Sequence, residues 1–581
     1  MAEFENETIA YFSMEICLEP HIPTYSGGLG ILAGDTLRSA ADLELPMTAV
    51  SLAHRKGYFR QHLDPNGQQT ESPENWCPEN ILEGADTRVT VEIEGRTVHV
   101  RAWRYPVQGA TGHIVPVYLL DTDVPENSEW DRTLTDVLYG GDARYRLAQE
   151  IVLGMGGAAL LQALGMDAGV HYHINEGHAA LLTLTLLDRQ LGSRPPWEAA
   201  ETDLESVRRQ CVFTTHTPVP AGHDTFPESQ VARALGERTV ALLSATRCCD
   251  DDGSLNMTYL ALRLSRYING VALRHREVSR GMFPAHAIDA VTNGVHAPTW
   301  TSQPFQTLFD RHVPEWRRDN LYLRYAIGIP VTEIREAHAK AKREMIAEVE
   351  RRTGVHLDAG AMTVGFARRA TPYKRADMIF SDPDRLRAIV HSTGPLQIVY
   401  GGKAHPNDEG GKALIRHIVE ESHALEGAVK VVYLENYEMD LAFKLTSGVD
   451  VWLNNPRKPL EASGTSGMKA ALNGVPSLSV LDGWWIEGHI EGVTGWSIGG
   501  STGVAPDDAA EANDLYVKLE HVVLPLFYGL PLAFAEVMRH AIALNGSFFN
   551  TQRMVGQYVR NAYFPTYDES TPEHASVPVR L

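Results

Sequence analysis

Short apolar runs alternate with longer stretches of helical periodicity in the second half of the chain. Apolar strands are predicted at 362–366, 396–400, 429–434, 449–453 and 477–481. The helical stretches between them begin at 375, near 413 and at 468. Continuous apolar strands separated by helices are typical of a parallel sheet that helices cover on both faces. We therefore predict a doubly wound α/β domain in this half.

The first half follows a looser version of the same pattern. Strands are predicted at 10–16, 170–174 and 211–214, a hairpin at 89–101, and helices at 31–43, 151–164, 179–191 and 332–352. We expect an N-terminal domain of residues 1–355, a C-terminal domain of residues 356–540, and a final helix and tail at 541–581 that packs back on the first domain. Two such α/β domains predict a deep ligand cleft between them, because ligands bind at the carboxyl ends of parallel strands.

The composition narrows the range of partners. Asp and Glu number 73 against 52 Lys and Arg, which gives a net charge of −21. Such an acidic surface argues against binding to nucleic acid or to an anionic membrane. No CxxC pair occurs, and His171 and His173 have no carboxylate at ligand spacing, so no metal site is predicted. Without a basic leader or an apolar run of about 20 residues, we expect a cytoplasmic protein.

The segment Glu461-Ala-Ser-Gly-Thr-Ser-Gly-Met-Lys469 lies between a predicted strand and a predicted helix. Its small residues and the free amides of the helix start suit a phosphate group. A lysine at a helix start is most often solvated. The apolar neighbours of Lys469 nevertheless predict that its side chain faces inward. Burial would lower the pKa of this amine, which favours Schiff-base formation.

Two further segments could bind anions. Arg368, Arg369, Lys374 and Arg375 are four cations within eight residues at the end of a predicted strand. Arginine offers phosphate a planar donor fork and lysine a point charge, although a solvated helix start would carry the same residues. The segment Tyr25-Ser-Gly-Gly-Leu-Gly30 follows the first strand and opens a helix, where it is either an anion-binding loop or a tight turn. It has neither the GxGxxG spacing nor the GK[ST] of a P-loop.

Taken together, these motifs resemble the glycogen and starch phosphorylases, most closely their short bacterial and archaeal-type form. The likeness runs from about Tyr11 to about Tyr563 and is carried most specifically by residues 461–469. The order of Ser26 to Gly30, Asn175-Glu-Gly-His178, Thr292-Asn293-Gly294 and Arg369 to Lys374 also fits.

The resemblance implies a GT-B architecture of two Rossmann-like domains. It also implies phosphorolysis of α-1,4-glucan or maltodextrin by inorganic phosphate, with release of α-D-glucose 1-phosphate, and allows a homodimer. The implied cofactor is pyridoxal 5′-phosphate, held as a Schiff base on Lys469, whose phosphate relays a proton while the anomeric configuration is retained.

The implied roles fall on residues that match the family motifs. The phosphate-binding cations are Arg369 and Lys374, with Tyr373 beside the sugar. Cofactor contacts, besides Lys469, are Gly27, Gly28, Arg368, Tyr437, Thr465 and Ser466. Substrate contacts, besides the cations, are Leu29, His178, Asn293, Glu461, Ser463 and Gly464.

Three positions depart from the animal-type pattern. Arg368 stands where a lysine is usual, Glu438 where an arginine is frequent, and Cys17 where an aromatic residue lies beside the cofactor. The chain also lacks the N-terminal extension that carries nucleotide control in the long phosphorylases, so we expect no activation by AMP.

Two other functions are compatible with parts of the pattern. A nucleotide-sugar glucan synthase shares the fold, but its Lys-Thr-Gly-Gly-Leu loop is replaced here by Tyr25-Ser26-Gly27-Gly28-Leu29. An inactive glucan-binding protein would not need the whole set of Lys469, Arg369, Lys374, His178 and Glu461. Pyridoxal absorbance distinguishes the first alternative, and glucose 1-phosphate release distinguishes the second.

Overall fold

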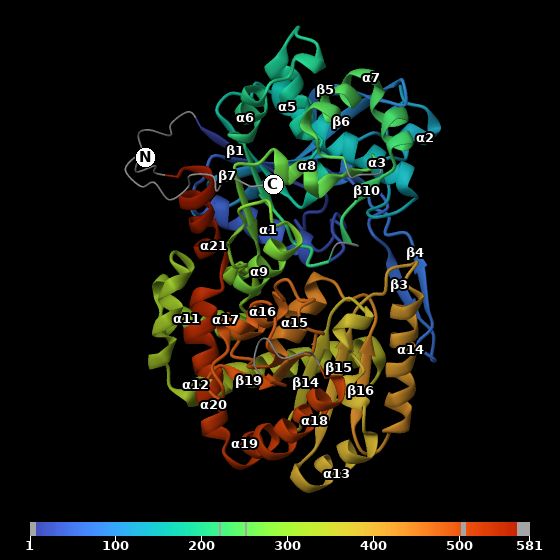
Figure 1. Ribbon diagram of the computed structural model, residues 1–581. Coiled ribbons are helices and arrows are strands. Elements are labelled where there is room, and N and C mark those ends of the chain that lie inside the picture. The colour runs from blue at the N-terminus through green and yellow to red at the C-terminus, as the bar shows by residue number, and fades with distance from the viewer. Residues whose placement is uncertain (1–6, 220–221, 250–252, 501–506, 566–581) are drawn as a thin grey trace.

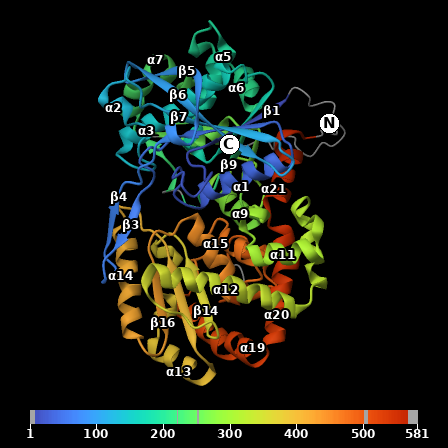
Figure 2. The ribbon, with the colours of Figure 1, turned by 180° about the vertical axis from the view of Figure 1, so that it is seen from behind.

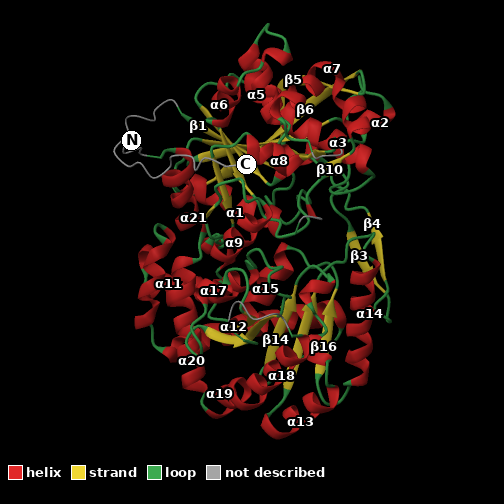
Figure 3. Ribbon diagram, in the orientation of Figure 1, coloured by secondary structure: helices red, strands yellow, loops and turns green. Residues whose placement is uncertain are grey.

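The computed structural model describes residues 7–219, 222–249, 253–500 and 507–565, which form two stacked α/β lobes (Figure 1). A nine-stranded sheet is the centre of the N-terminal lobe (Figure 3). Its strands lie in the order β13 (Asp289–Ala290), β12 (Tyr267–Gly270), β9 (Cys211–Thr214), β8 (Val170–Asn175), β1 (Thr8–Ser13), β2 (Met47–Leu52), β7 (Ile114–Asp121), β6 (Arg96–Gln108) and β5 (Glu83–Ile93). All neighbours are parallel except the β5–β6 and β6–β7 pairs, which form the predicted hairpin and its junction with the sheet.

The C-terminal lobe contains a wholly parallel sheet of six strands. Their order is β16 (Lys430–Leu434), β15 (Leu396–Gly401), β14 (Met362–Ala367), β17 (Val451–Asn454), β18 (Ser477–Val480) and β19 (Gly495–Ile498). The central strands β14, β15, β17 and β18 are buried at every residue, as parallel strands between helical layers must be. The predicted α/β class with two Rossmann-like sheets is confirmed.

Helices surround both sheets. Those of the N-terminal lobe are α1 (Gly28–Asp42), α2 (Glu129–Arg132), α3 (Ala143–Ile151), α4 (Gly157–Ala163), α5 (Leu182–Leu191), α6 (Glu201–Arg208), α7 (Glu228–Thr246), α8 (Met257–Arg263) and α9 (Leu273–Met282). The following helices are α10 (Ala297–Trp300), α11 (Gln303–His312), α12 (Val331–Thr353), α13 (Pro383–Thr393), α14 (Glu409–Ala424), α15 (Met439–Gly448), α16 (Ser466–Leu472), α17 (Trp485–Gly488), α18 (Asp508–Lys518), α19 (Leu524–Gly529), α20 (Pro531–His540) and α21 (Thr551–Tyr558).

Several predicted boundaries are wrong in detail. The helix predicted from 375 is replaced by two 3-10 turns, Pro372–Lys374 and Met378–Phe380. The regular helix α13 begins only at Pro383, where the Asp382 side chain accepts the amide of Arg385 as an N-cap. The helix predicted at 151–164 begins earlier, at Ala143, and contains a π-helical turn at Val152–Gly156. The first strand ends at Ser13, because the chain turns there toward the glycine loop.

Three segments connect the lobes. Helix α12 packs against α15 of the C-terminal lobe, although the predicted boundary at 355 assigns it to the first domain. At the other end of the chain, α20 belongs to the lower lobe, whereas α21 packs on α1 of the upper lobe (Figures 1 and 2). The third is a hairpin arm, β3 (Arg60–Leu63) and β4 (Gln69–Ser72), which descends beside α14 in both views. The domain boundaries at 355/356 and 540/541 stay predictions, and the predicted tail beyond residue 565 lies outside the described residues.

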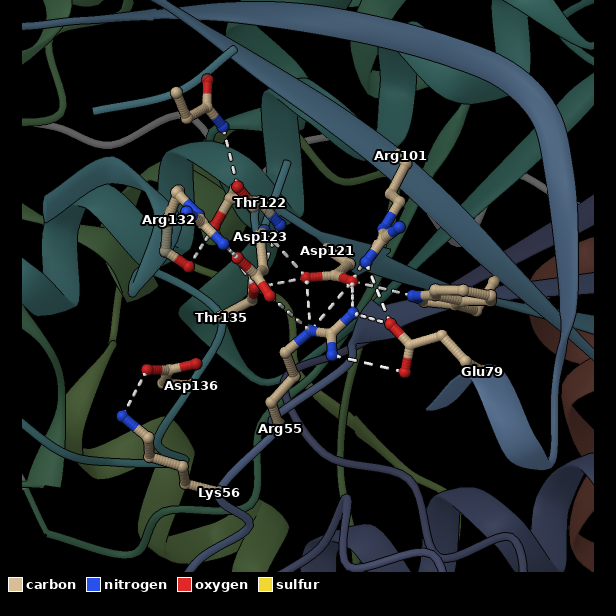
Figure 4. A network of polar contacts seen from close by, with 12 residues as sticks. Arg55, Lys56, Glu79, Arg101, Asp121, Thr122, Asp123, Arg132, Thr135 and Asp136 are labelled. Atoms are coloured by element: carbon tan, nitrogen blue, oxygen red, sulfur yellow. Dashed lines mark hydrogen bonds and ion pairs between the residues drawn. The ribbon is translucent and has the colours of Figure 1, made fainter. Parts of the chain in front are cut away.

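In the N-terminal lobe, a polar network fixes the loop that follows β2 (Figure 4). The buried Asp121 carboxylate, at the end of β7, accepts hydrogen bonds from Arg55 at 2.7 Å and Arg101 at 3.0 Å. The backbone amides of Arg55 and Lys56 donate to the carbonyls of Thr135 and Asp136. The network therefore holds the segment that continues to Tyr139, which reaches the candidate site.

No single helix within the described ranges is long and apolar enough to cross a membrane. One pair of helical segments, Asp508–Gly529 and Pro531–Gly546, meets the length and composition criteria together, but it is bent by 104°.

Candidate active site

Lys469 lies in α16, which follows β17 and the 461–466 loop. Its side chain is buried, and Nζ stands 3.7 Å from the centre of the Trp300 ring. The indole nitrogen of Trp300 in turn donates to the Asp35 carboxylate at 2.7 Å. Burial lowers the pKa of Lys469 to about 8, and the amine makes no ion pair within the described ranges. The predicted inward orientation of Lys469 is confirmed.

A cation–carboxylate cluster forms beyond the carboxyl end of β14. Glu461 receives an ion pair from Arg368 at 2.6 Å and from Lys374 at 2.5 Å. Burial opposes ionisation of Glu461, but the two cations outweigh it and lower its pKa to about 2. The Glu461 carboxylate thus offers anionic oxygen atoms to the two cations, as a bound phosphate would.

Arg369 and Tyr373 stand on the open side of this cluster. The Arg369 side chain is exposed and makes no ion pair with any described residue. The ammonium of Lys374 lies 4.5 Å from the centre of the Tyr373 ring. Of the predicted phosphate-binding cations, Lys374 is therefore engaged by Glu461, whereas Arg369 hydrogen-bonds Tyr373 and forms no ion pair within the described ranges.

The glycine loop is held by a residue that sequence reasoning missed. The Glu15 carboxylate accepts the amides of Ser26 at 2.6 Å and Gly27 at 3.2 Å, together with the Tyr139 hydroxyl at 2.9 Å. The Gly27 amide is consequently not free for an anion, contrary to expectation. Gly28 begins α1, and a Cβ built on it would meet no atom within 4 Å, so the backbone there is open to a ligand. Leu29 follows it in the first turn of the helix.

His178 follows β8 and lies close to Tyr139, with ring centres 5.8 Å apart. Burial lowers the pKa of His178 to about 4, so the ring is neutral at neutral pH. Its Nε2 lies 3.4 Å from Asp224, which is paired with Arg146 at 2.7 Å. Glu15, Tyr139 and Asp224 carry no local sequence motif. Only their approach in space associates them with His178 and the glycine loop.

Four buried polar atoms near these groups have no hydrogen-bond partner within the described part of the chain. They are Nδ1 of His178, Oδ1 of Asn293, Oγ of Ser463 and Nη1 of Arg368. Buried polar atoms are nearly always satisfied in proteins, so a set without partners indicates a site for a polar ligand. All four belong to residues that the family resemblance assigned to substrate or cofactor.

The remaining predicted residues surround α16 and β15. Gly464 has φ +89°, and its neighbour Ser463 accepts the Trp484 amide through its carbonyl at 2.9 Å. Ser466 accepts the indole N–H of Trp452 at 3.0 Å, while Thr465 precedes the helix without a side-chain cap bond. Tyr437 packs against Gly401, where a Cβ would lie 3.1 Å from its ring. Trp484, Trp485 and Trp496 are buried and belong to the core.

No cluster of three or more His, Cys, Asp or Glu side chains that could hold a metal occurs among the described residues.

Comparison with known proteins identifies the family. The model of the carbohydrate phosphorylase family matches residues 17–129 and 228–494. A maltodextrin phosphorylase of Thermococcus litoralis is 40% identical over 96% of this chain and 70% of its own length. Glycogen phosphorylases of Mycobacterium tuberculosis and Aquifex aeolicus are 38% and 37% identical over 96% of this chain, and over 71% and 86% of their own lengths.

Proposed function

The chain belongs to the carbohydrate phosphorylase family, and we propose that it is an α-glucan phosphorylase that uses pyridoxal 5′-phosphate. The proposed reaction is reversible phosphorolysis of an α-1,4-glucan at its non-reducing end, with release of α-D-glucose 1-phosphate. The observation that carries the cofactor assignment is the buried amine of Lys469, with a pKa of about 8 and no carboxylate partner among the described residues. Family membership separates this proposal from the nucleotide-sugar synthase considered above.

The donor groups of the site suit pyridoxal phosphate. Lys469 would attach the cofactor through its amine, and the Nη1 of Arg368, which has no partner within the described ranges, would meet an anionic oxygen. Tyr437, Thr465, Ser466 and the open backbone at Gly28 complete the proposed cofactor site, in which Gly27 supports the turn. When bound, the cofactor supplies a phosphate group whose second pKa of about 6 suits proton transfer at neutral pH.

The protein residues divide the remaining work. Arg369 and Lys374 would bind inorganic phosphate, and Tyr373 would contact the sugar beside it. For Lys374 this requires that Glu461 exchange its ion pair for a sugar hydroxyl when substrate enters. His178, Asn293, Ser463, Gly464 and Leu29 would hold the glucosyl unit, the first three through atoms for which the described part of the chain offers no hydrogen-bond partner.

The proposed bond changes conserve atoms and configuration. Inorganic phosphate protonates the leaving glycosidic oxygen, the bond to the anomeric carbon breaks, and a phosphate oxygen attacks that carbon on the same face. Neighbouring phosphates repel one another, and the cations Arg368, Arg369 and Lys374 offset this repulsion. The product therefore retains the α configuration.

Two measurements on freshly purified protein test the proposal. We expect a near-ultraviolet absorbance band, borohydride reduction that adds the cofactor mass to Lys469, and glucose 1-phosphate from maltodextrin plus phosphate. Lys469→Ala should lose the cofactor first and activity as a consequence. Absence of the chromophore after incubation with pyridoxal phosphate would contradict the cofactor assignment, and glucan binding without turnover would indicate an inactive binding protein.

A further inference from the structure

The segment 436–439, which carries Tyr437, is held at its first residue by the opposite lobe. The backbone N–H of Gln61, in the β3–β4 arm, donates to Asn436 Oδ1 at 2.7 Å. The backbone N–H of Asn436 donates to Gln61 Oε1 at 3.0 Å, and Asn436 Nδ2 donates to the backbone carbonyl of Gln61 at 2.9 Å. Both residues are buried, and each side chain bonds the backbone of the other residue, so these polar groups are satisfied away from water.

The rest of the segment is also in contact with N-terminal residues. The amide of Met439 donates to the Tyr25 hydroxyl at 3.0 Å, directly beside the glycine loop. Glu438 lies 3.5 Å from Lys403, whose ammonium donates to the Phe59 carbonyl at 2.8 Å. Tyr437 therefore sits in a loop that belongs to one lobe by sequence and is fixed at both ends by the other.

Gln61 reaches a second part of the anion site. Its Nε2 donates to the Gly402 carbonyl at 2.9 Å. Gly402 has φ +147°, and a Cβ there would lie 1.8 Å from the carbonyl oxygen of Arg368, so the two backbones are in close contact. One buried glutamine thus touches both the segment that carries Tyr437 and the backbone behind Arg368.

We propose that Gln61 is a positioning residue for the cofactor-phosphate site, which it orders from the opposite lobe through Asn436 and Gly402. This inference rests on the proposed function. Removing the Gln61 side chain leaves the buried backbone amide of Asn436 without its acceptor and takes one of two donors from the Gly402 carbonyl, which keeps the Tyr433 hydroxyl at 2.9 Å. Of these contacts at the start of the 436–439 segment, only the bonds between the Asn436 side chain and the Gln61 backbone then remain. Gln61 touches no reacting group, so its effect should appear in cofactor retention before it appears in the chemistry.

The test compares cofactor release and amide hydrogen exchange in the holoenzyme and in Gln61→Ala. We expect cofactor release about tenfold faster and a similar rise in the exchange rate of 436–439, the size of effect expected for losing buried hydrogen bonds. Asn436→Gly, which keeps the positive φ of 54° at that residue, should give the same result. Gln61→Ala removes the bonds that the Gln61 side chain makes to the Asn436 amide and the Gly402 carbonyl, whereas Asn436→Gly removes the bonds that the Asn436 side chain makes to the Gln61 backbone. The double variant should therefore release the cofactor faster than either single variant.

Gln68→Ala is the matched control. Gln68 lies at the tip of the same arm and pairs with Arg416 on the surface, without contact to Asn436 or Gly402. It should change cofactor release and segment exchange by less than about twofold. Thermal unfolding of each variant establishes that it is folded.

A folded Gln61→Ala protein that releases its cofactor at the wild-type rate would overturn the proposal, even if its stability falls, because the arm would then only join the lobes. Unchanged exchange at 436–439 would overturn it equally. A wild-type protein that never binds pyridoxal phosphate would instead contradict the proposed function, and the exchange data would still decide whether Gln61 orders the segment.

Discussion

At the scale of single residues, burial gives two charged side chains opposite properties. Lys469 is buried beside an aromatic face without a carboxylate partner in the described ranges, so its charged form is destabilised. Glu461 is equally buried but contacts two cations, so its charged form is stabilised. The site therefore combines a lysine that readily becomes a neutral nucleophile with a carboxylate that stays ionised.

The pKa of Lys469 predicts how cofactor attachment depends on pH. Only the neutral amine attacks a carbonyl, and with a pKa of about 8 roughly one tenth of it is neutral at pH 7. Attachment to cofactor-stripped protein should accelerate up to about pH 8 and then level off, as followed by absorbance in a stopped-flow instrument. Lys469→Ala provides the blank, and acceleration that continues to pH 10 would show an unshifted lysine.

The linked stability of the cofactor-free protein has a definite sign. Between pH 8 and the ordinary lysine value of 10.5, the unfolded chain holds a proton that the folded chain has lost. The contribution of Lys469 to the free energy of unfolding therefore rises with pH across this window. Urea unfolding at pH 8 and pH 10 should show a larger rise in the free energy of unfolding for wild type than for Lys469→Met. The same change between the two pH values in both proteins would contradict this prediction.

Glu461→Gln should separate two effects of this carboxylate: it neutralises two buried cations, and it competes with phosphate for them. The substitution leaves Arg368 and Lys374 buried without their counter-charge, so we expect a loss of about 3 kcal/mol in the free energy of unfolding. Inorganic phosphate should restore part of this stability and should bind the variant more tightly than wild type, because the competing carboxylate is gone. Thermal unfolding against phosphate concentration measures both effects, and the same titration on Arg416→Ala serves as the surface control. Phosphate affinity equal to wild type would show that Glu461 does not compete for this site.

At the scale of elements, the site lies where strands end and helices begin. Lys469 and the 461–466 loop follow β17, Arg368 and Arg369 follow β14, and His178 follows β8. Helix α16 can bring Lys469 inward because its start packs tightly on the core: a Cβ on Gly467 would lie 2.7 Å from the Trp484 ring. The small residues of this loop are thus required by packing as well as by ligand approach.

Gly467→Ala tests this packing requirement. The added methyl group would overlap Trp484, so we expect a loss of about 1–3 kcal/mol in stability and weaker cofactor retention. Gly556→Ala in α21 is the matched change, since a Cβ there meets no atom within 4 Å and should stabilise the helix by about 0.5–1 kcal/mol. Chemical denaturation of both variants gives the comparison, and equal effects would contradict the packing argument.

At the scale of the whole molecule, the site depends on contacts between distant parts of the chain. The 292–294 turn is fastened by Arg553 of α21, which donates to the carbonyls of Thr292 and Asn293 at 2.6 and 2.9 Å. The Thr292 hydroxyl donates to Glu487 of the C-terminal lobe at 2.7 Å. Asn293 is therefore positioned by the last helix and by the opposite lobe together.

Gly294→Ala should disturb this long-range junction. A Cβ at residue 294 would lie 2.2 Å from the backbone carbon of Asn550, which cannot move without shifting α21. We expect a loss of at least about 2 kcal/mol in stability and an increased KM for glucan, because Asn293 moves with the turn. Steady-state kinetics and thermal unfolding measure the two effects, and an unchanged KM in a destabilised protein would place Asn293 outside the sugar site.

The sequence by itself determined the alternation of strands and helices, the two α/β sheets and the inward orientation of the Lys469 side chain. These follow from local hydrophobic periodicity and from a contiguous motif, which act over a few residues. It predicted a helix at 375–380 wrongly, because Pro383 and the Asp382 cap delay the regular helix. Only the tertiary structure decided that Glu15 occupies the Gly27 amide, that Glu461 pairs with Arg368 and Lys374, and that Gln61 holds Asn436. These contacts join residues from 12 to 375 positions apart, and such pairs arise from folding of the whole chain, which no local pattern encodes.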